Sequence, residues 1–310
     1  MLDRSSQWLA RHATRLMVLS IVVGITIPPM AALLRPYLTE IVWAILFLAM
    51  LQFDWDAVWG YLRRPFLMML AVGWLVLATP VLLSPIVASF GLPGGIAAAL
   101  ILSAASAPIM STPAICMIIG LDAALSLVVL LLTTLVVPFT FPVIAIELLD
   151  LEIGLTTREL MWRLGVLIGS AMALTVVVQR FLGSARLAAA TASLDSCKLI
   201  VLLAMAVALM DGIGALIIER PVYVLLVVAL SFVANAGMQI FAVVPFLAMG
   251  KRPALTVAFS AGNRNMAIIL AVIPAGIMPD LELYLVLAQV PMYVLPSLLV
   301  PLYKRVFAIE

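Results

Sequence analysis

The stretch SAGNRNMAIIL, from Ser260 to Leu270, places Arg264 between two asparagines, with apolar sequence on either side. If this region is a membrane helix, Arg264 lies about 16 Å from Pro253 at 1.5 Å per residue, which is half the thickness of a bilayer core. An arginine at that depth costs about 2.5–3.5 kcal/mol on the membrane-insertion scale. Snorkelling to the interface is difficult from there, so we expect Arg264 to face a protein interior.

The composition of the whole chain places this stretch in a membrane protein. Of the 310 residues, 66% are hydrophobic and 10% are charged, whereas soluble domains carry roughly a quarter charged residues. A water-soluble core could not absorb so much apolar surface. Apolar runs of helix-spanning length follow one another almost from end to end, separated by Pro, Gly or paired charges. The chain is therefore expected to be an all-α polytopic membrane protein.

The apolar runs predict ten transmembrane helices. Lysine and arginine gather in the segments that are cytoplasmic if the amino terminus is inside, for example at Arg63, Arg64, Lys251 and Arg252. This positive-inside pattern predicts that both termini are cytoplasmic, and we expect an integral protein of the bacterial inner membrane. The predicted spans are 13–33, 37–53, 66–88, 94–119, 122–148, 160–182, 196–218, 221–249, 253–277 and 281–306.

A weak internal repeat divides the chain into two halves, 1–155 and 156–310. Five spans in each half give the two halves opposite orientations, which is the inverted-repeat architecture of secondary transporters, with the site at interrupted helices near mid-membrane. Three pairs of motifs recur in the same order: LRRP at 62–65 with IERP at 218–221, SAASAPIMSTPA at 103–114 with AFSAGNRNMA at 258–267, and VVPFTFP at 136–142 with VLPSLLVP at 294–301.

The middle pair of motifs predicts that the fourth and ninth spans are broken and cross. Pro108 and Pro113 each remove a backbone donor within the fourth span, and hydroxyls lie between them. In the ninth span, a glycine accepts unusual dihedrals and amide side chains can replace backbone partners. The residues of the two predicted breaks are Pro108, Ser111, Thr112 and Pro113 in the first, and Ser260, Gly262, Asn263, Arg264 and Asn265 in the second.

Two roles remain open for the guanidinium of Arg264. Its donors are expected to point at carbonyls or hydroxyls of the fourth-span break around Ser111 and Thr112, or at a substrate carboxylate. In the first case the side chain holds the crossing together permanently. In the second it is the counter-charge of a transported anion.

The chain resembles the bile acid:sodium symporter family over nearly its whole length. The similar stretches are FDWDAVWGYLRRP at 53–65, GLDAALSLVVLLLTTLVVPFTFP at 120–142 and LTVAFSAGNRNMA at 255–267. The resemblance implies a panel of spans 1, 2, 6 and 7, and a core of spans 3, 4, 5, 8, 9 and 10 in which the broken helices cross. It also implies that an organic anion binds between panel and core.

The sequence departs from this family at the positions that hold sodium. Ser260 replaces a glutamate, Arg264 replaces a glutamine, and Leu75 and Leu130 replace polar residues, while Ser126 is retained. Sodium prefers oxygen ligands with anionic help, so we expect no classical sodium coupling. The charge of Arg264 is expected to take the place of sodium at the crossing.

Two further groups of polar or aromatic residues have expected positions. Asn235 and Gln239 are four residues apart on one helix face, which suits core hydrogen bonding and a cavity lining equally. Asp211 lies in the seventh span or at its outer end. Aromatic residues expected near the membrane interfaces are Trp8, Trp55, Trp59 and Tyr303.

These observations together favour a secondary transporter for a small organic anion or amphipathic acid. A non-transporting membrane sensor or scaffold with the same fold is the alternative. An intramembrane enzyme is not expected, because the chain offers neither two facing carboxylates nor a buried histidine or lysine beside a serine. The expected partners are the lipid bilayer and the anion, without nucleic acid, cofactor or metal.

Overall fold

A computed structural model describes residues 2–53 and 60–306, and every regular element in these ranges is helical. Trp55 and Trp59 lie outside the described residues. Within these ranges, six helices are long and apolar enough to cross a membrane, and Arg15–Thr26 and Gly94–Ala105 are shorter apolar helices. The prediction of an all-α membrane protein is thus confirmed. The six candidate spans are Pro28–Met50, Pro65–Ser89, Ala123–Leu148, Thr157–Leu182, Thr191–Ala208 and Pro221–Met249.

The chain folds into two compact units. Unit 1 consists of residues 1–53 and 165–224, and unit 2 consists of residues 54–164 and 225–310. Helices α10 (Thr157–Leu182) and α14 (Pro221–Val243) each contribute residues to both units.

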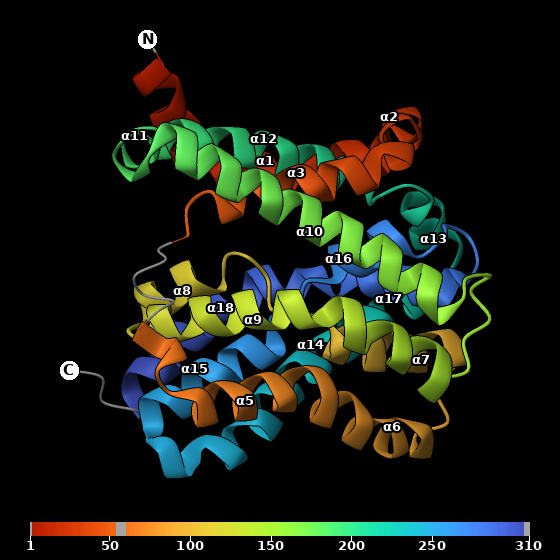
Figure 1. The fold of residues 1–310 in the computed structure, drawn as a ribbon. Coiled ribbons are helices and arrows are strands. Elements are labelled where there is room, and N and C mark those ends of the chain that lie inside the picture. The colour runs from red at the N-terminus through yellow and green to blue at the C-terminus, as the bar shows by residue number, and fades with distance from the viewer. Residues whose placement is uncertain (1, 54–59, 307–310) are drawn as a thin grey trace. The chain divides into compact units, whose positions relative to one another are not determined.

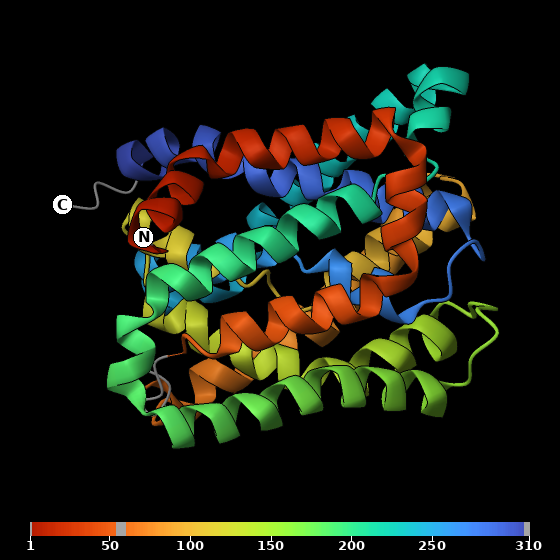
Figure 2. The same cartoon turned by 90° about the horizontal axis from the view of Figure 1, so that it is seen from above.

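In unit 1, helix α12 packs against α1, α2 and α3. Figure 1 shows α1, α3, α10 and α12 running alongside one another, and Figure 2 shows α12 between α1 and α3. The first predicted span is shorter than expected, because Pro28 begins a new helix directly after α1. The helices of this unit, besides its part of α10, are α1 (Leu2–Thr26), α2 (Pro28–Leu34), η1 (Arg35–Tyr37), α3 (Leu38–Met50), α11 (Ser184–Ala189), α12 (Thr191–Ala208) and α13 (Ile213–Glu219).

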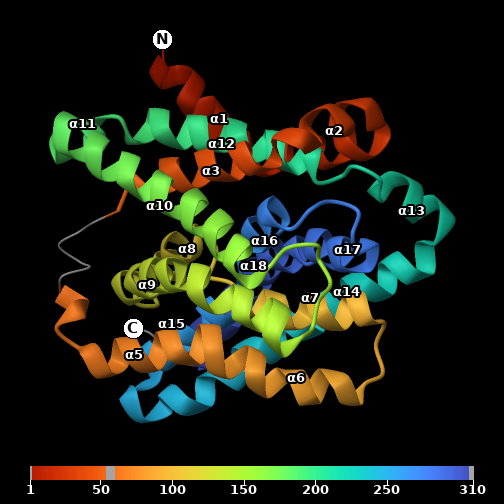
Figure 3. The ribbon, with the colours of Figure 1, turned by 45° about the vertical axis from the view of Figure 1, so that its right-hand side comes forward.

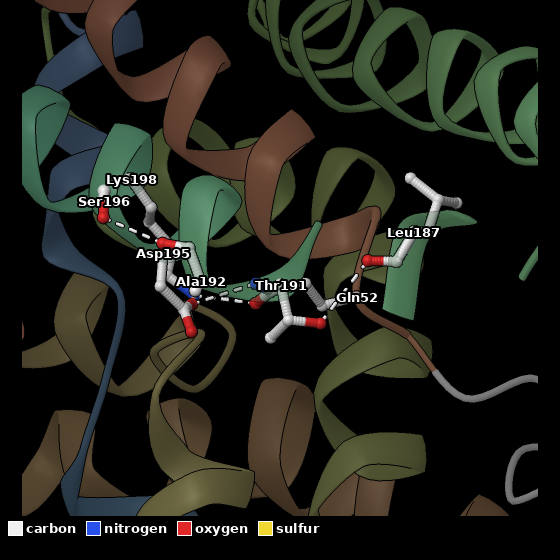
Figure 4. Close-up of polar contacts among 7 residues, drawn as sticks. All are labelled: Gln52, Leu187, Thr191, Ala192, Asp195, Ser196 and Lys198. Carbon is white, nitrogen blue, oxygen red and sulfur yellow. Dashed lines mark hydrogen bonds and ion pairs between the residues drawn. The ribbon is translucent and has the colours of Figure 1, made fainter. Parts of the chain in front are cut away.

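A polar cluster fixes the end of α3 in unit 1. The Gln52 amide nitrogen donates to Asp195 Oδ1 over 2.9 Å, and Lys198 Nζ donates to Gln52 Oε1 over 2.8 Å and to Asp195 Oδ1 over 2.9 Å (Figure 4). The Gln179 amide reaches the Leu51 carbonyl over 3.3 Å. At its other end, α12 stops at Ala208, earlier than the predicted span 196–218, and Asp211 is exposed in the turn that follows.

In unit 2, a third-span helix, two interrupted helices and a long fifth-span helix pack together (Figure 3). Helix α9 packs against α8 and α15, and α7 packs against α16 and α17. The helices of unit 2, besides its parts of α10 and α14, are α5 (Pro65–Gly73), the π-helical turn η2 (Trp74–Ala78), α6 (Thr79–Ser89), α7 (Gly94–Ala105), α8 (Thr112–Ile119), α9 (Ala123–Pro142), the π-helical turn η3 (Val143–Leu148), η4 (Val244–Met249), α15 (Lys251–Gly262), α16 (Met266–Val272), α17 (Pro279–Leu287) and α18 (Gln289–Val306).

Asp122 fixes the start of α9 between α8 and α15. Its carboxylate accepts the Leu125 amide over 2.9 Å, as an N-cap does, and also accepts the Tyr61 hydroxyl. Its backbone amide donates to the Thr256 hydroxyl over 3.1 Å. Burial, followed by the bond to Asp122, raises the pKa of Tyr61 to about 12, so the phenol remains a donor at physiological pH.

Candidate functional site

The fourth predicted span is interrupted between Ala105 and Thr112. Helix α7 ends where Ser106 becomes extended, at φ −81° and ψ 165°. Pro108 lies within the interruption, whereas Pro113 lies in the first turn of α8, where a missing amide hydrogen removes no helical bond. Pro108 thus belongs to the break itself, and Pro113 helps to restart the helix.

The ninth predicted span is interrupted between Gly262 and Met266. Helix α15 ends at Gly262, and the flanking Asn263 (φ −100°, ψ 81°) and Asn265 (φ −83°, ψ 80°) are not helical. The Asn263 side chain closes the end of α15, because its amide nitrogen donates to the Phe259 carbonyl over 2.8 Å. Its Oδ1 atom is buried without a hydrogen-bond partner.

The two interruptions satisfy each other's backbone groups. Pro108 and Arg264 form an isolated antiparallel bridge. The Ile109 amide donates to the Asn263 carbonyl over 2.9 Å, and the Asn265 amide donates to the Ala107 carbonyl over 2.7 Å. Two amides and two carbonyls that helices would otherwise use are therefore paired, as unwound backbone requires in an apolar interior.

Arg264 is fully buried and donates to three backbone carbonyls. Nε donates to Ala261 over 2.7 Å, Nη1 to Ser106 over 2.8 Å and Nη2 to Leu75 over 3.1 Å. The three acceptors belong to α15, to the end of α7 and to the π-helical turn η2. The side chain therefore joins the third, fourth and ninth predicted spans within unit 2.

Arg264 bonds to a carbonyl at the fourth-span break, as one of its two predicted roles requires, but this carbonyl belongs to Ser106 and not to the region around Ser111 and Thr112. The Thr112 hydroxyl donates to the Ile109 carbonyl over 2.7 Å, and Ser111 is exposed. Both residues stand at the amino-terminal end of α8, which offers amide donors. A guanidinium has only donors to offer, so it bonds instead to Ser106, where α7 ends in free carbonyls.

Helix ends also balance the charge of Arg264. Among the residues that the structure describes, it is the only charged side chain that is fully buried. Two helices end beside it, α7 at Ala105 and α15 at Gly262, and each carboxyl-terminal end carries about −0.5 of an elementary charge. Together they offer about one negative charge, so a carboxylate partner is not needed.

The Leu75 carbonyl is available to Arg264 because its own helix cannot use it. In the π-helical turn the Thr79 amide donates to the Trp74 carbonyl, five residues back. The corresponding donor for Leu75 would be residue 80, which is Pro80 and has no amide hydrogen. The side chain of Leu75 gives no indication of this role, whereas the proline five residues later is a sequence signal for an unused carbonyl.

Replacing Pro80 should therefore make the Leu75 carbonyl less dependent on Arg264 for a hydrogen bond. Pro80→Ala restores an amide donor, and we expect the destabilisation caused by Arg264→Lys to fall by about 1 kcal/mol in the Pro80→Ala background. A double-mutant cycle of thermal stability on purified protein measures this coupling. Pro85→Ala, which changes an exposed proline in the same helix α6, is the control and should add independently. If the effects of Pro80→Ala and Arg264→Lys were simply additive, Pro80 would not be the reason why the Leu75 carbonyl is available to Arg264.

Four of the predicted site residues make no bond to Arg264, and only Asn235 among them bonds to the backbone of an interruption. The Ser260 hydroxyl donates back to Thr256 over 2.9 Å, and the Ser126 hydroxyl is buried beside the Cys116 thiol without a bond to either interruption. Asn235 donates to the Gly262 carbonyl over 2.7 Å and accepts from Gln239, also over 2.7 Å. Of the two roles left open for this amide pair, the structure gives core hydrogen bonding.

A shallow apolar hollow lies beside the end of α7, too narrow to hold a water molecule. In this conformation Arg264 has no exposed surface, so a ligand cannot reach its guanidinium. The residues that line the hollow are Ser106, Ala107, Val137, Phe141, Leu164, Ile268 and Ile269.

Comparison with protein-family models and with curated proteins finds no match for this chain. The two interruptions and Arg264 are therefore the features from which a function can be inferred.

Proposed function

We propose that the protein is a secondary transporter for a small organic anion or an amphipathic acid, with a fold like that of the bile acid:sodium symporter family. The observation that carries the proposal is the mutual pairing of two interrupted helices in an apolar interior. Non-helical backbone at membrane depth is tolerated only inside protein or along a cavity. In secondary transporters it marks the substrate site.

The proposed architecture has ten spans in two inverted repeats, 1–155 and 156–310, with both termini in the cytoplasm of a bacterial cell. Spans 1, 2, 6 and 7 form a panel, and the other six spans form a core that contains the crossing. The division into two compact units supports this arrangement, because unit 1 contains predicted spans 1, 2 and 7 and most of span 6, and unit 2 contains the others except the first four residues of span 8. Alternating access would then change the position of one unit against the other.

Arg264 acts in this proposal as a permanent replacement for a bound cation. Its three carbonyl acceptors and the two adjacent helix ends support this role over direct pairing with a substrate carboxylate. A fixed charge cannot be exchanged between the two sides of the membrane. Transport is therefore proposed to proceed without sodium.

Sodium should accordingly leave the stability of the protein unchanged. We expect the same melting temperature, within about 1 °C, when sodium chloride is exchanged for potassium chloride at constant ionic strength. A sodium site filled at 100 times its Kd would stabilise the folded state by about 2.7 kcal/mol. A saturable rise of the melting temperature specific to sodium would show that other oxygens form a sodium site.

Transport itself can be tested with purified protein in liposomes. Labelled taurocholate, an amphipathic anion that remains ionised, serves as the first probe, and liposomes without protein are the control. Saturable uptake that persists in potassium buffer supports the proposal. Uptake that requires a sodium gradient would support transport but contradict the role of Arg264 as a replacement for sodium. Tight binding without uptake would favour a sensor or scaffold.

A further inference from the structure

Tyr303, Gln239 and Asn235 form a buried hydrogen-bonded chain that ends on the backbone of the ninth-span interruption. The Tyr303 hydroxyl donates to Gln239 Oε1 over 2.8 Å, Gln239 Nε2 donates to Asn235 Oδ1 over 2.7 Å, and Asn235 Nδ2 donates to the Gly262 carbonyl over 2.7 Å. The three residues are 6%, 6% and 3% exposed. The chain therefore connects α18 through α14 to the end of α15.

The direction of these bonds is set by the chemistry of the last acceptor. The Gly262 carbonyl can only accept, so Asn235 must present its nitrogen to it and its oxygen to Gln239. Gln239 must then present its own oxygen to Tyr303, whose hydroxyl has to donate. Without that hydroxyl, Gln239 Oε1 loses its donor. Gln239 is then held by one bond fewer, so it restrains Asn235, and through it the Gly262 carbonyl, less firmly.

The ring of Tyr303 lies against both interrupted helices. It meets Phe259 of α15 edge-on, with ring centroids 6.2 Å apart and an angle of 84° between the planes. It belongs to an apolar cluster with Cys116 of α8 and Leu255 of α15. Since α8 and α15 flank the two interruptions, Tyr303 is held by the same elements that its hydroxyl helps to align.

The hydrogen-bonded side chains of Gln239 and Asn235 leave no room for a side chain at Gly262. A methyl group at this position would lie 2.5 Å from Gln239 Cγ and 2.7 Å from Asn235 Oδ1. The amide pair thus packs directly on the backbone that precedes Asn263. The Asn263 carbonyl, one residue further on, accepts the Ile109 amide.

We infer that Tyr303 is a positioning residue for the paired interruptions. Through Gln239 and Asn235 it holds the Gly262 carbonyl, and thereby keeps Asn263 and the following residues aligned with the fourth-span break. This inference goes beyond the proposed transport function, because it concerns the backbone pairing and can be tested without a substrate.

The test is amide hydrogen exchange of purified Tyr303→Phe, which keeps the ring and removes the hydroxyl. We expect the amides of Ile109 and Asn265 to exchange about tenfold faster, because local opening separates the two interruptions, with no change in α9 and α17. Ser231→Ala is the matched control: Ser231 is a buried residue one turn before Asn235 in α14, and its hydroxyl bonds back to Val228 over 2.7 Å.

A double-mutant cycle separates positioning from a general loss of stability. In an Asn235→Ala background, Tyr303→Phe should have no further effect on the exchange of Ile109 and Asn265. Gln239→Met, which keeps the length of the side chain, replaces Asn235→Ala if that variant does not fold. Unchanged exchange at the two amides, equal acceleration throughout unit 2, or additive effects of the two substitutions would each overturn the inference.

Discussion

Arg264→Lys lowers the melting temperature of the purified protein by about 5–15 °C, whether or not an organic anion is present. Lysine keeps the charge but lacks the planar five-donor fork, so at least two of the three carbonyls at Leu75, Ser106 and Ala261 lose their donor. Each unsatisfied buried group costs about 1–3 kcal/mol, and each kcal/mol corresponds to roughly 2–4 °C in a larger protein. Arg264→Ala is expected to be worse, because the charge is lost as well. Thermal unfolding in detergent measures both.

The control for this prediction is Arg163→Lys in the same unit. Arg163 is exposed, and its single described bond reaches the Val272 carbonyl over 3.4 Å. Its replacement should change stability by no more than about 0.5 kcal/mol. If Arg264→Lys were equally mild but weakened anion binding, Arg264 would be the counter-charge of the substrate. If Arg264→Ala changed neither stability nor transport, the assignment of Arg264 to the buried crossing would fail.

Gly262→Ala is expected to destabilise the protein by about 2–4 kcal/mol. The added methyl group would lie within 2.8 Å of both Gln239 and Asn235, including the backbone carbonyl of Asn235, which cannot rotate away. Relief requires α14 to move from α15, which costs about 1–3 kcal/mol of packing and breaks the bond from Asn235 to the Gly262 carbonyl. The melting temperature reports the loss, and exchange of the Asn265 amide reports its position.

Gly237 provides the matched control on the facing helix. A methyl group there would meet nothing within 4 Å, and alanine is favoured over glycine inside a helix by roughly 0.5–1 kcal/mol. Gly237→Ala should therefore be neutral or stabilising. An equally harmless Gly262→Ala would mean that α14 does not approach the interruption as closely as the structure indicates.

The sequence was sufficient to locate the interruptions, because their causes are visible in side-chain chemistry. A proline lacks an amide hydrogen, a glycine tolerates unusual dihedrals, and an arginine deep in apolar sequence needs acceptors. These properties do not depend on tertiary structure. Both interruptions, and the burial of Arg264, could therefore be predicted from residues 103–114 and 258–267.

The partners of these residues could not be predicted in the same way, because the important acceptors are backbone carbonyls. Every residue has one, so Leu75 and Ser106 carry no compositional signal for binding a guanidinium. The place of Tyr303 near the end of a span predicts a position near a membrane interface, but it does not predict that the side chain is packed inside the protein and only 6% exposed. Its role depends on how α18 packs against α14, which the hydrophobic pattern of α18 alone does not determine.

The carbonyl that Pro80 leaves unused restricts how the helices around Arg264 can move. If the third-span helix moved along its axis by one turn, about 5.4 Å, the Leu75 carbonyl would no longer reach Arg264. Both Arg264 Nη2 and the Leu75 carbonyl would then be buried without a hydrogen bond. The same holds for Ser106 at the end of α7. Any large displacement of these helices must therefore carry η2, the end of α7 and the end of α15 together as one rigid block. Bending is therefore expected in the segments that connect these helices to the rest of the protein.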